Sequence, residues 1–501
     1  MSLIEVGKTF PPENHIERIA KYHRMKAYFN GNHADIYDRM HRLLKDSPQK
    51  PQLETLYIAV NLPYILSLKP ADLLIGDRPT YDSGEKDDSQ EQKALNSYVE
   101  ENDLNTLIYE SATSGSYRGD SFLKVRFGKR EDTTELAKYG LTSVGRSEAI
   151  IEHAAADMVF PEVVEGNVKK FKAFNVCVIE WVDEGKKEVP YLIVEKHLPG
   201  YIINERYRMK EIPETVNNQY GYPISTYLIE EKVDTGLDKD VVKTGAKHPL
   251  VFHIPYSSVD DDWKGKGFIE TVEHALQALE DRLAQLDYVL LKHTDPLLYG
   301  PELSGVAGTP SATQFGGKYI PLGKDDVQPG AVTWDSQMEG AFKEIGFLVS
   351  YIFQMSETPQ WLFGTTISDG NAGGTGTSHS DGTAIKARFM PILSKVKRIR
   401  NGFDKAVRDA LWACFQLDKA HGTYTGKDIY PKIYWKDGIP KNEKEEAEIM
   451  AIRTGDKPTL DQKTAIKRQD ELDDMQADEI LKRIAEDEMR YEPVSSNVFN
   501  E

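Results

Sequence analysis

The chain has 501 residues, of which 40% are hydrophobic, and this size and composition predict more than one buried core. Its formal net charge is -18, with 80 acidic and 62 basic residues, which excludes capture of nucleic acid by overall charge. Cys177 and Cys414 are the only cysteines, too few for a disulfide framework or a cysteine-based zinc site.

No segment has the length and apolar character of a signal peptide or a membrane span. The stretch from Met1 to Arg24 lacks an apolar core and carries charges throughout. We therefore expect a soluble protein from a reducing compartment, with no membrane partner.

The first part of the chain is predicted to be mainly helical. An amphipathic helix is expected from His15 to Leu44 with a break at Asn30-Gly31-Asn32, a buried apolar helix within Asn61–Pro79, and a third helix from Gln90 to Ser116. Gly119-Asp120 then predicts a turn into a strand.

The segment from Ala149 to Ile254 carries short apolar stretches separated by charged turns or turns with Gly and Asn. This spacing predicts an antiparallel β region of roughly a hundred residues. Because helices dominate on both sides of it, the chain is predicted to belong to the α+β class.

Two later segments carry narrow apolar seams in which the residues recur at steps of three and four. The first follows the polar link Val259–Gly267, and the second lies between Met338 and Met355. Such seams predict helices that pack along another helix. The residues expected to pack are Ile269, Val272, Leu276, Leu279, Leu283 and Leu286 in the first seam, and Ile345, Leu348 and Ile352 in the second.

The insert between these helices, residues 296–335, holds short strand candidates separated by Gly and Pro turns. It is too small for an independent core and is expected to gain burial from neighbours, which points to oligomerisation.

A polar loop separates the second seam from a long helix. From Gly364 to Gly382 the chain holds six Gly and seven Ser or Thr in 19 residues, a composition that cannot bury a core. Helical periodicity returns from Thr383 to Leu417, with Pro391 accommodated as a kink. A strand candidate follows at Tyr430–Trp435, and the tail from Asp437 to Glu501 is acidic and helical, with 18 acidic against 10 basic residues.

Several motifs suggest enzymatic chemistry only weakly. The loop Gly370–Ser378 lacks the Gly-Lys-Ser/Thr ending of a phosphate-binding loop, and no strand is predicted before it. Asp260, Asp261 and Asp262 have the chemistry of metal ligands, but an acidic run is more often a solvated link. No HExxH or Gly-x-Ser-x-Gly pattern occurs. We therefore expect no catalytic residue, no metal site and no cofactor.

Basic side chains between Lys386 and Arg408 are interleaved with the apolar residues of the long helix. This face either meets DNA phosphates or is a solvated or intersubunit face, and the second interpretation is the usual one for a charge-laced helix.

The order of these parts resembles the portal proteins of tailed double-stranded DNA bacteriophages of the siphophage type. The resemblance rests on loose motifs that span nearly the whole chain. They are Tyr28-Phe-Asn-Gly-Asn-His33, Asn61-Leu-Pro-Tyr-Ile65, Leu74-Ile-Gly-Asp-Arg-Pro79, Gly119-Asp-Ser-Phe-Leu-Lys-Val125, Gly267–Arg282 leading to Asp295-Pro296, and Pro440–Gly455 followed by Leu460-Asp-Gln462.

The resemblance implies a subunit with an α/β wing, a two-helix stem, a small β-containing clip and a helical crown, assembling into a ring, usually a dodecamer. By position, the implied parts are residues 1–265 for the wing, 266–295 and 336–356 for the stem helices, 296–335 for the clip, 357–382 for a tunnel loop, 383–436 for the long helix and a wing strand, and 437–501 for the crown.

The same resemblance implies a non-enzymatic channel at one capsid vertex of the virion, assembled in the host cytoplasm, through which double-stranded DNA is packaged and ejected. The implied partners are the terminase large subunit, the major capsid or scaffold protein and a head-tail adaptor protein. The residues implied to face DNA are Gln360, Trp361, Thr365, Thr366, Ser368, Asn371, Gly373, Gly374, Thr375, Thr377 and Ser378.

Two rivals remain from other classes of function. One is a metal- or nucleotide-dependent enzyme that processes nucleic acid, using Asp260 to Asp262 or the Gly-rich loop. The other is a structural scaffold or adaptor without a DNA channel.

Overall fold

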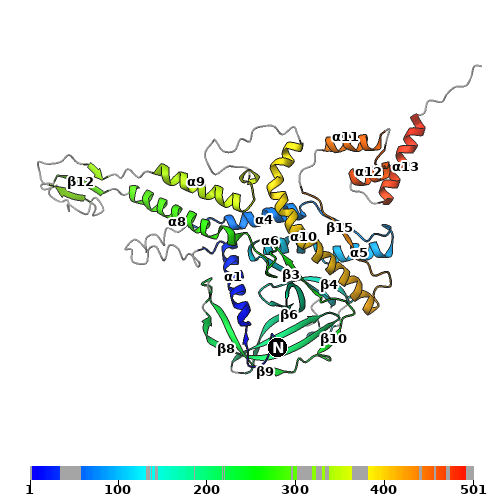
Figure 1. Cartoon of the computed structure of the whole chain (residues 1–501), viewed down its shortest axis with the longest axis horizontal. Helices are drawn as coiled ribbons and strands as arrows, with labels where there is room; N and C mark the ends of the chain where they lie inside the picture. Colours follow the sequence, from blue (N-terminus) through cyan, green and yellow to red (C-terminus); the bar gives the residue numbers. More distant parts are fainter. Residues whose placement is uncertain are drawn as a thin grey trace, which may run out of the picture.

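The computed structural model describes residues 3–33, 58–130, 136, 138–141, 145–185, 187–216, 218, 220–294, 297–301, 319–322, 330–332, 338–363, 382–438, 443–455, 458–469 and 474–491. Its helices and strands form a body from which one helix pair projects, with a small sheet at the far end of the pair (Figure 1). The mixture of separate helical and antiparallel β parts confirms the α+β class.

Within the described ranges, four helices precede the first long strand. They are α1 (Glu13–Phe29), α4 (Leu62–Ile75), α5 (Gln90–Glu101) and α6 (Leu104–Arg118). The side chain of Asn61 caps the start of α4 by accepting a hydrogen bond from the Tyr64 amide at 3.3 Å, and Ser89 caps α5 in the same way.

The prediction of one continuous helix from Gln90 to Ser116 is wrong. The chain breaks between α5 and α6, where Asp103 adopts a left-handed conformation with φ of 43°. Asp tolerates this region better than most residues because its short polar side chain bonds locally. The first predicted helix breaks where expected, since α1 stops at Phe29, just before Asn30-Gly31-Asn32, and the predicted continuation to Leu44 lies mostly outside the described part.

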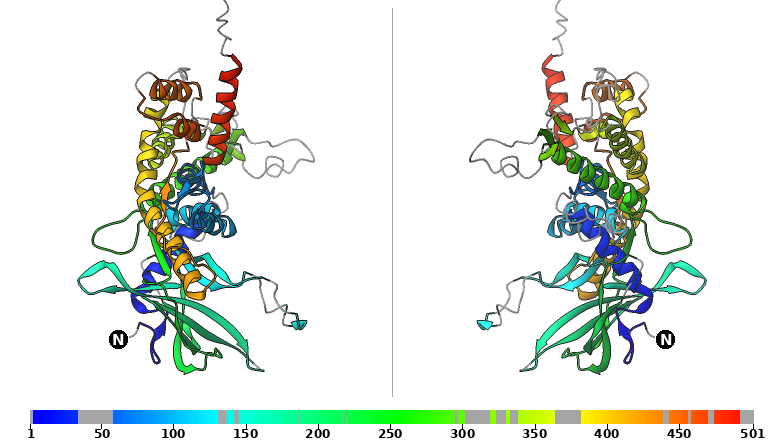
Figure 2. Two further views of the ribbon diagram at one scale, coloured as in Figure 1. Left: turned by 90° about the vertical axis from the view of Figure 1, so that its right-hand side faces the viewer. Right: turned by 90° about the vertical axis from the view of Figure 1, so that its left-hand side faces the viewer.

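The predicted β region forms a large antiparallel sheet with strand order β1-β9-β8-β7-β6-β5, and β10 pairs with β8. Its strands are β1 (Thr9–Phe10), β5 (Val159–Val164), β6 (Asn167–Asp183), β7 (Glu188–Leu198), β8 (Tyr201–Val216), β9 (Ile224–Val233) and β10 (Val241–Lys243). Figure 2 shows this sheet at the end of the body opposite to the C-terminal helices.

Two smaller sheets complete the described part of the body. One has the order β11-β3-β4, formed by β3 (Asp120–Gly128), β4 (Glu148–Ala154) and β11 (Val251–Pro255). The other pairs β2 (Thr80–Asp82) with β15 (Lys432–Tyr434), which joins the chain's first hundred residues to the segment after its longest helix.

The projecting pair consists of α8 (Ile269–Thr294) and α9 (Met338–Met355). Between them lie β12 (Leu297–Pro301), β13 (Tyr319–Leu322) and β14 (Gly330–Val332), in which β12 pairs parallel with β13 and antiparallel with β14. The strand candidates of the insert therefore form one three-stranded sheet.

A short 3-10 helix, Gln360–Phe363, follows α9, and α10 (Gly382–His421) then crosses the body with Pro391 inside it. The last helices are α11 (Glu443–Thr454), α12 (Gln462–Gln469) and α13 (Asp474–Tyr491). No helix within the described ranges combines the length and the apolar character that crossing a bilayer requires.

A large core lies between α10, the helices α4 to α6 and the sheet β11-β3-β4. Ile399, Phe403, Val407 and Leu411 of α10 are fully buried in it. A second core joins the end of α1 and the start of α4 to α8 and α9. The helix pair is thus rooted in the body by apolar packing as well as by the chain connections.

Candidate functional site

The two predicted seams meet in the helix pair. Ile269, Val272, Leu276 and Leu279 of α8 are buried in one cluster with Ile352 of α9. Leu283, Ile345 and Leu348 are half-buried at the edge of this cluster, and Leu286 is half-buried further out along α8. Across the pair, Arg282 Nε donates to Glu344 Oε1 at 2.9 Å.

A second, polar seam on α8 was not predicted. Four polar residues of α8 contact four residues of the α1 region, and the pairs are Glu270 with Lys21, Glu273 with Arg24, Gln277 with Tyr28, and Glu280 with His33. The Arg24 to Glu273 pair is 2.7 Å long, and the side chains of His33 and Glu280 are completely buried. The steps of three, four and three residues along α8 were the available signal, because they repeat the spacing of the apolar seam.

The face of α9 turned away from its buried side carries a third apolar seam. Phe347, Tyr351 and Met355 recur at steps of four and are 68%, 40% and 42% exposed. The rings of Phe347 and Tyr351 stack with centroids 6.4 Å apart. Exposed apolar side chains aligned in this way are typical of a surface that packs against a partner.

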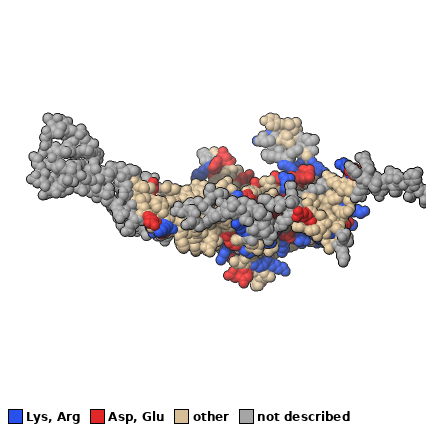
Figure 3. Space-filling view, turned by 90° about the horizontal axis from the view of Figure 1, so that it is seen from above, with Lys and Arg blue, Asp and Glu red and all other residues tan. Residues whose placement is uncertain are grey.

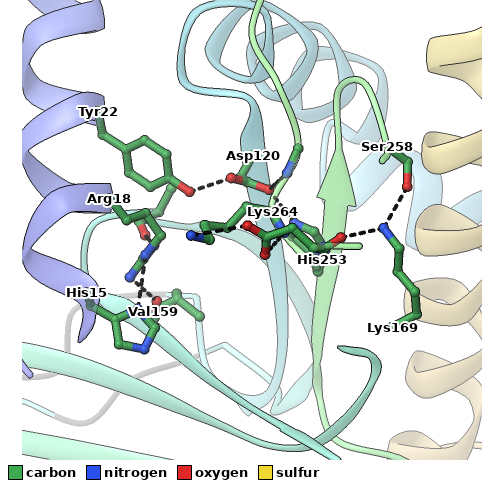
Figure 4. Close-up of polar contacts among 12 residues, drawn as sticks. His15, Arg18, Tyr22, Asp120, Val159, Lys169, His253, Ser258 and Lys264 are labelled. Atoms are coloured by element: carbon green, nitrogen blue, oxygen red, sulfur yellow. Dashed lines mark hydrogen bonds and ion pairs between the residues drawn. The ribbon is translucent and has the colours of Figure 1, made fainter. Parts of the chain in front are cut away.

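The root of α8 is held by a buried polar network around Asp120, at the start of β3 (Figure 4). Tyr22 Oη donates to Asp120 Oδ2 at 2.5 Å, Gly265 N donates to Oδ1 at 2.7 Å, and His253 Nε2 lies 2.6 Å from Oδ1. Burial by itself raises the pKa of the Asp120 carboxyl, but His253, Tyr22 and Gly265 outweigh it, and the net pKa is lowered. The carboxylate therefore stays charged and ties α1, β3, β11 and the link before α8 together.

Glycine allows this link to approach the body closely. Gly119 has φ of 94°, and a Cβ there would lie 2.4 Å from the Gly265 carbonyl oxygen. A Cβ on Gly267 would lie 2.6 Å from the Tyr117 carbonyl oxygen. The segment Val259–Gly267, predicted only as a polar link, is therefore packed backbone to backbone against the end of α6.

Arg18 of α1 extends the network to the large sheet (Figure 4). Its Nη1 donates to the Ala156 carbonyl at 2.6 Å and its Nη2 to the Val159 carbonyl at 3.0 Å. Its Nε donates to His15 Nδ1, and burial together with the positive charge of Arg18 lowers the pKa of His15 to about 3. A neutral His15 can accept this bond across the physiological range.

The end of α9 meets α10 at a junction that also contains buried polar groups. Lys395 of α10 is 5% exposed and donates from Nζ to the Ser356 carbonyl at 2.8 Å. Its ammonium lies 4.9 Å from the Phe268 ring centroid. The interpretation of all basic residues from Lys386 to Arg408 as one exposed face is wrong at Lys395, because a long side chain at a core-facing position is covered by its neighbours.

Of the other described basic residues of this stretch, three are paired with carboxylates, whereas Arg388, Lys397 and Lys405 are exposed. Arg398 pairs with Glu357, Arg400 with Asp437 at 3.1 Å, and Arg408 with Asp404 at 3.2 Å. On the face drawn in Figure 3, basic and acidic side chains are intermixed over the described surface.

The predicted DNA-facing residues fall in two groups. Gln360 and Trp361 lie in the 3-10 helix after α9, where Gln360 is half-buried and Trp361 is 37% exposed and packs edge-on against Phe389. The remaining nine predicted residues, between Thr365 and Ser378, lie outside the described part of the chain.

The described residues give no support to a metal-dependent enzyme. No group of three or more His, Cys, Asp or Glu side chains in these ranges is arranged to hold a metal ion. Asp260 and Asp261 are exposed, while Asp262 accepts from the Lys264 amide at 3.1 Å and pairs with the Lys264 ammonium. The Gly-rich loop of the nucleotide hypothesis lies outside the described residues.

Fold and site together define an elongated α+β subunit with a projecting, firmly rooted helix pair. The family model described as "Phage portal protein, SPP1 Gp6-like" matches residues 10–142 and 307–491, which is more than half of the chain. The chain therefore belongs to this portal protein family.

Among curated proteins, none matches the chain. Among solved structures, the chain is similar to one from the virion of a native gene transfer agent (GTA) particle, with 11% identity, a TM-score of 0.40, and coverage of 84% of this chain and 93% of that one. It is also similar to one from the neck of a native GTA particle computed with C12 symmetry, with 13% identity, a TM-score of 0.39, and coverage of 84% and 93%.

Proposed function

We propose that this protein is a portal subunit that forms a ring, a dodecamer, around a channel for double-stranded DNA at one vertex of a phage capsid. DNA would be packaged and later ejected through this channel. Family membership carries the proposal. The projecting pair α8–α9, with an apolar seam left exposed on α9, is the feature of the subunit that gives the assembly a physical basis.

In this assembly residues 1–265 form the wing, 266–295 and 336–356 the stem, 296–335 the clip, 357–382 a tunnel loop, 383–436 the long helix with a wing strand, and 437–501 the crown. The polar seam between α1 and α8 supports this assignment, because it fixes the inner end of the stem to the wing. The clip sheet of β12, β13 and β14 has too few residues for its own core and would gain burial from neighbouring copies.

A conduit must let the phosphate backbone slide in both directions. A chain with net charge -18 that offers Ser, Thr and Gly between Thr365 and Ser378 would make weak, non-specific contacts with DNA. The subunit itself would be non-enzymatic, without cofactor. ATP hydrolysis would come from the terminase large subunit, which docks near the clip and is later replaced by a head-tail adaptor, while the wing meets the major capsid or scaffold protein.

The first prediction concerns assembly through α9. Phe347→Glu places a charge in the exposed seam, which would be buried against a second copy in the ring, so we expect rings to be replaced by folded monomers. Native mass spectrometry with negative-stain imaging measures this outcome. Val241→Glu, at a residue 54% exposed on β10, is the matched control and should leave the rings intact.

The same measurement can contradict the proposed function. The expected wild-type result is a closed ring with a central opening. A stable dimer or tetramer without an opening would overturn the portal assignment, and so would divalent-dependent nuclease activity or ATP turnover by the purified protein.

A further inference from the structure

Unfavourable features of different kinds gather where the end of α9 meets α10. Glu357, the second residue after α9, has φ of 53°, a left-handed conformation that is strained for a side chain of this type. Two buried polar atoms nearby in the chain or in space, Tyr256 Oη and Gln360 Nε2, have no hydrogen-bond partner among the described residues. Lys395 adds a buried cation.

Three of these residues, Tyr256, Glu357 and Lys395, lie close together. The Lys395 ammonium bonds the Ser356 carbonyl and lies 5.9 Å from the centroid of the Tyr256 ring. Arg398, one turn further along α10, places Nη2 2.5 Å from both carboxylate oxygens of Glu357. Because Arg398 and Glu357 are both substantially exposed, their pair holds the junction only weakly.

We propose that this junction is a built-in joint, in which α9 separates from α10 by releasing Lys395 from its buried position into water. Opening would hydrate the ammonium, free the Tyr256 hydroxyl to bond water, and let Glu357 leave its strained conformation. In the sequence, residues 364–381 lie between α9 and α10. The joint therefore sets the relative position of the two parts of the chain that precede and follow these residues.

Protonation gives the joint a defined pH dependence. Burial lowers the pKa of Lys395 from 10.5 to about 7, with Glu357 acting to raise it and Arg398 to lower it further. Tyr256 is a further titratable group at the junction, and burial raises its pKa well above its usual value. The Tyr256 hydroxyl therefore stays protonated between pH 6 and 9, the range in which Lys395 changes its charge.

The direction of the pH dependence follows from the difference in the pKa of Lys395 between the closed and open states. In the open state Lys395 would be hydrated and would titrate near 10.5, whereas in the closed state it titrates near 7. Between these values opening takes up a proton, so the opening equilibrium constant falls about tenfold for each rise of one pH unit. Below about pH 7 the lysine is charged in both states, and the opening constant is at its maximum and constant.

Hydrogen exchange of the full-length protein tests the joint. Amides of the last turn of α9, in peptides that cover residues 349–358, are followed from pH 6 to pH 9 and corrected for the intrinsic exchange rate. The wild-type protein should show constant protection up to about pH 7 and then a gain approaching about tenfold per pH unit. Lys395→Met keeps the length of the side chain and removes the charge, and it should show high protection at every pH.

The control is Lys397→Met, on the exposed side of the same helix, which should retain the wild-type pH profile. Protection of the wild-type protein that does not change with pH would overturn the proposal, as would a Lys395→Met protein that exchanges faster than wild type. The wild-type profile is informative even where a variant fails to fold. Amide exchange can be measured whether the protein is monomeric or assembled. A result that contradicts the joint is therefore distinguishable from one that contradicts ring assembly.

Discussion

Asp120 and Lys395 are both ionisable groups buried within one subunit, and they differ in whether their surroundings stabilise the charged form. The Asp120 carboxylate has hydrogen-bond partners on Tyr22, His253 and the Gly265 amide, all within 2.7 Å, and these partners hold its pKa below the usual value. Lys395 has one carbonyl at 2.8 Å and otherwise aromatic rings, and burial lowers its pKa. A lowered pKa means that the charged form is stabilised at Asp120, which is an acid, and destabilised at Lys395, which is a base.

This difference teaches that burial of a charge does not by itself indicate rigidity. A carboxylate with three partners resists any motion that would break them, so the Asp120 network acts as an anchor for α1 and the root of α8. Moving an ammonium with too few partners into water is favourable, so the burial of Lys395 favours opening of the junction. Within one subunit, the root of the helix pair is fixed and the end of α9 is poised to move.

The largest expected effect is at the anchor. Asp120→Ala leaves Tyr22, His253 and the Gly265 amide without their acceptor, and we expect a loss of about 3–5 kcal/mol in the free energy of unfolding at neutral pH. Urea denaturation followed by tryptophan fluorescence measures it. The exposed Asp261→Ala is the control and should change stability by less than about 0.5 kcal/mol.

The pH dependence of that loss sharpens the comparison. Because the pKa of Asp120 lies below 3.8 in the folded protein, its contribution is fully present above about pH 4 and is lost as the pH falls through the folded pKa. The gap between wild type and Asp120→Ala should therefore narrow in acid. A gap that stays constant down to pH 2, or one below about 1 kcal/mol at pH 7, would contradict the anchor.

The opposite sign is expected at the joint. Lys395→Met replaces a buried, poorly partnered cation by an apolar side chain of similar length, and we expect stability to rise by about 1–4 kcal/mol at pH 6. The gain should shrink above about pH 7, where the wild-type lysine loses its charge on folding. Urea denaturation at pH 6 and pH 9 measures both, and a destabilised Lys395→Met protein would show that the ammonium is well partnered.

Sequence reasoning predicted much of the scaffold because periodicity reports local burial. The seams of α8 and α9, the strands after Ala149 and the long helix through Pro391 follow the expected ranges closely. The break at Asp103 was missed, since a single left-handed residue leaves the apolar pattern of the flanking helices intact.

The site was predicted less completely, for a different physical reason. Asp120 and Gly265 are 145 positions apart, and the network between them depends on tertiary contacts that no local pattern encodes. Lys395 was grouped with exposed basic residues because charge alone places a lysine at the surface. Its position three residues after Ile392 and one before Val396, both fully buried, was the available signal that this lysine lies on the covered face of α10.

The smallest effects come from a matched pair of tyrosines that differ in whether the hydroxyl has a partner. Tyr22→Phe removes a hydrogen bond to the charged Asp120, and we expect a loss of about 1.5–3 kcal/mol. Tyr256→Phe removes a buried hydroxyl that has no partner among the described residues, and we expect a gain of about 1 kcal/mol. Both substitutions keep the aromatic ring of the side chain, so the difference between their effects on stability does not come from a cavity.

The sign of the Tyr256→Phe effect is the sharper part of this test. If its hydroxyl is unsatisfied in the closed junction, removing it stabilises the closed state only, and amide protection at the end of α9 should rise about fivefold, the factor that corresponds to about 1 kcal/mol. The same substitution should leave protection around Asp120 unchanged, because the two sites share no hydrogen bond. A loss of stability like that of Tyr22→Phe would mean that the Tyr256 hydroxyl is bonded in solution, and the junction would then be a second anchor.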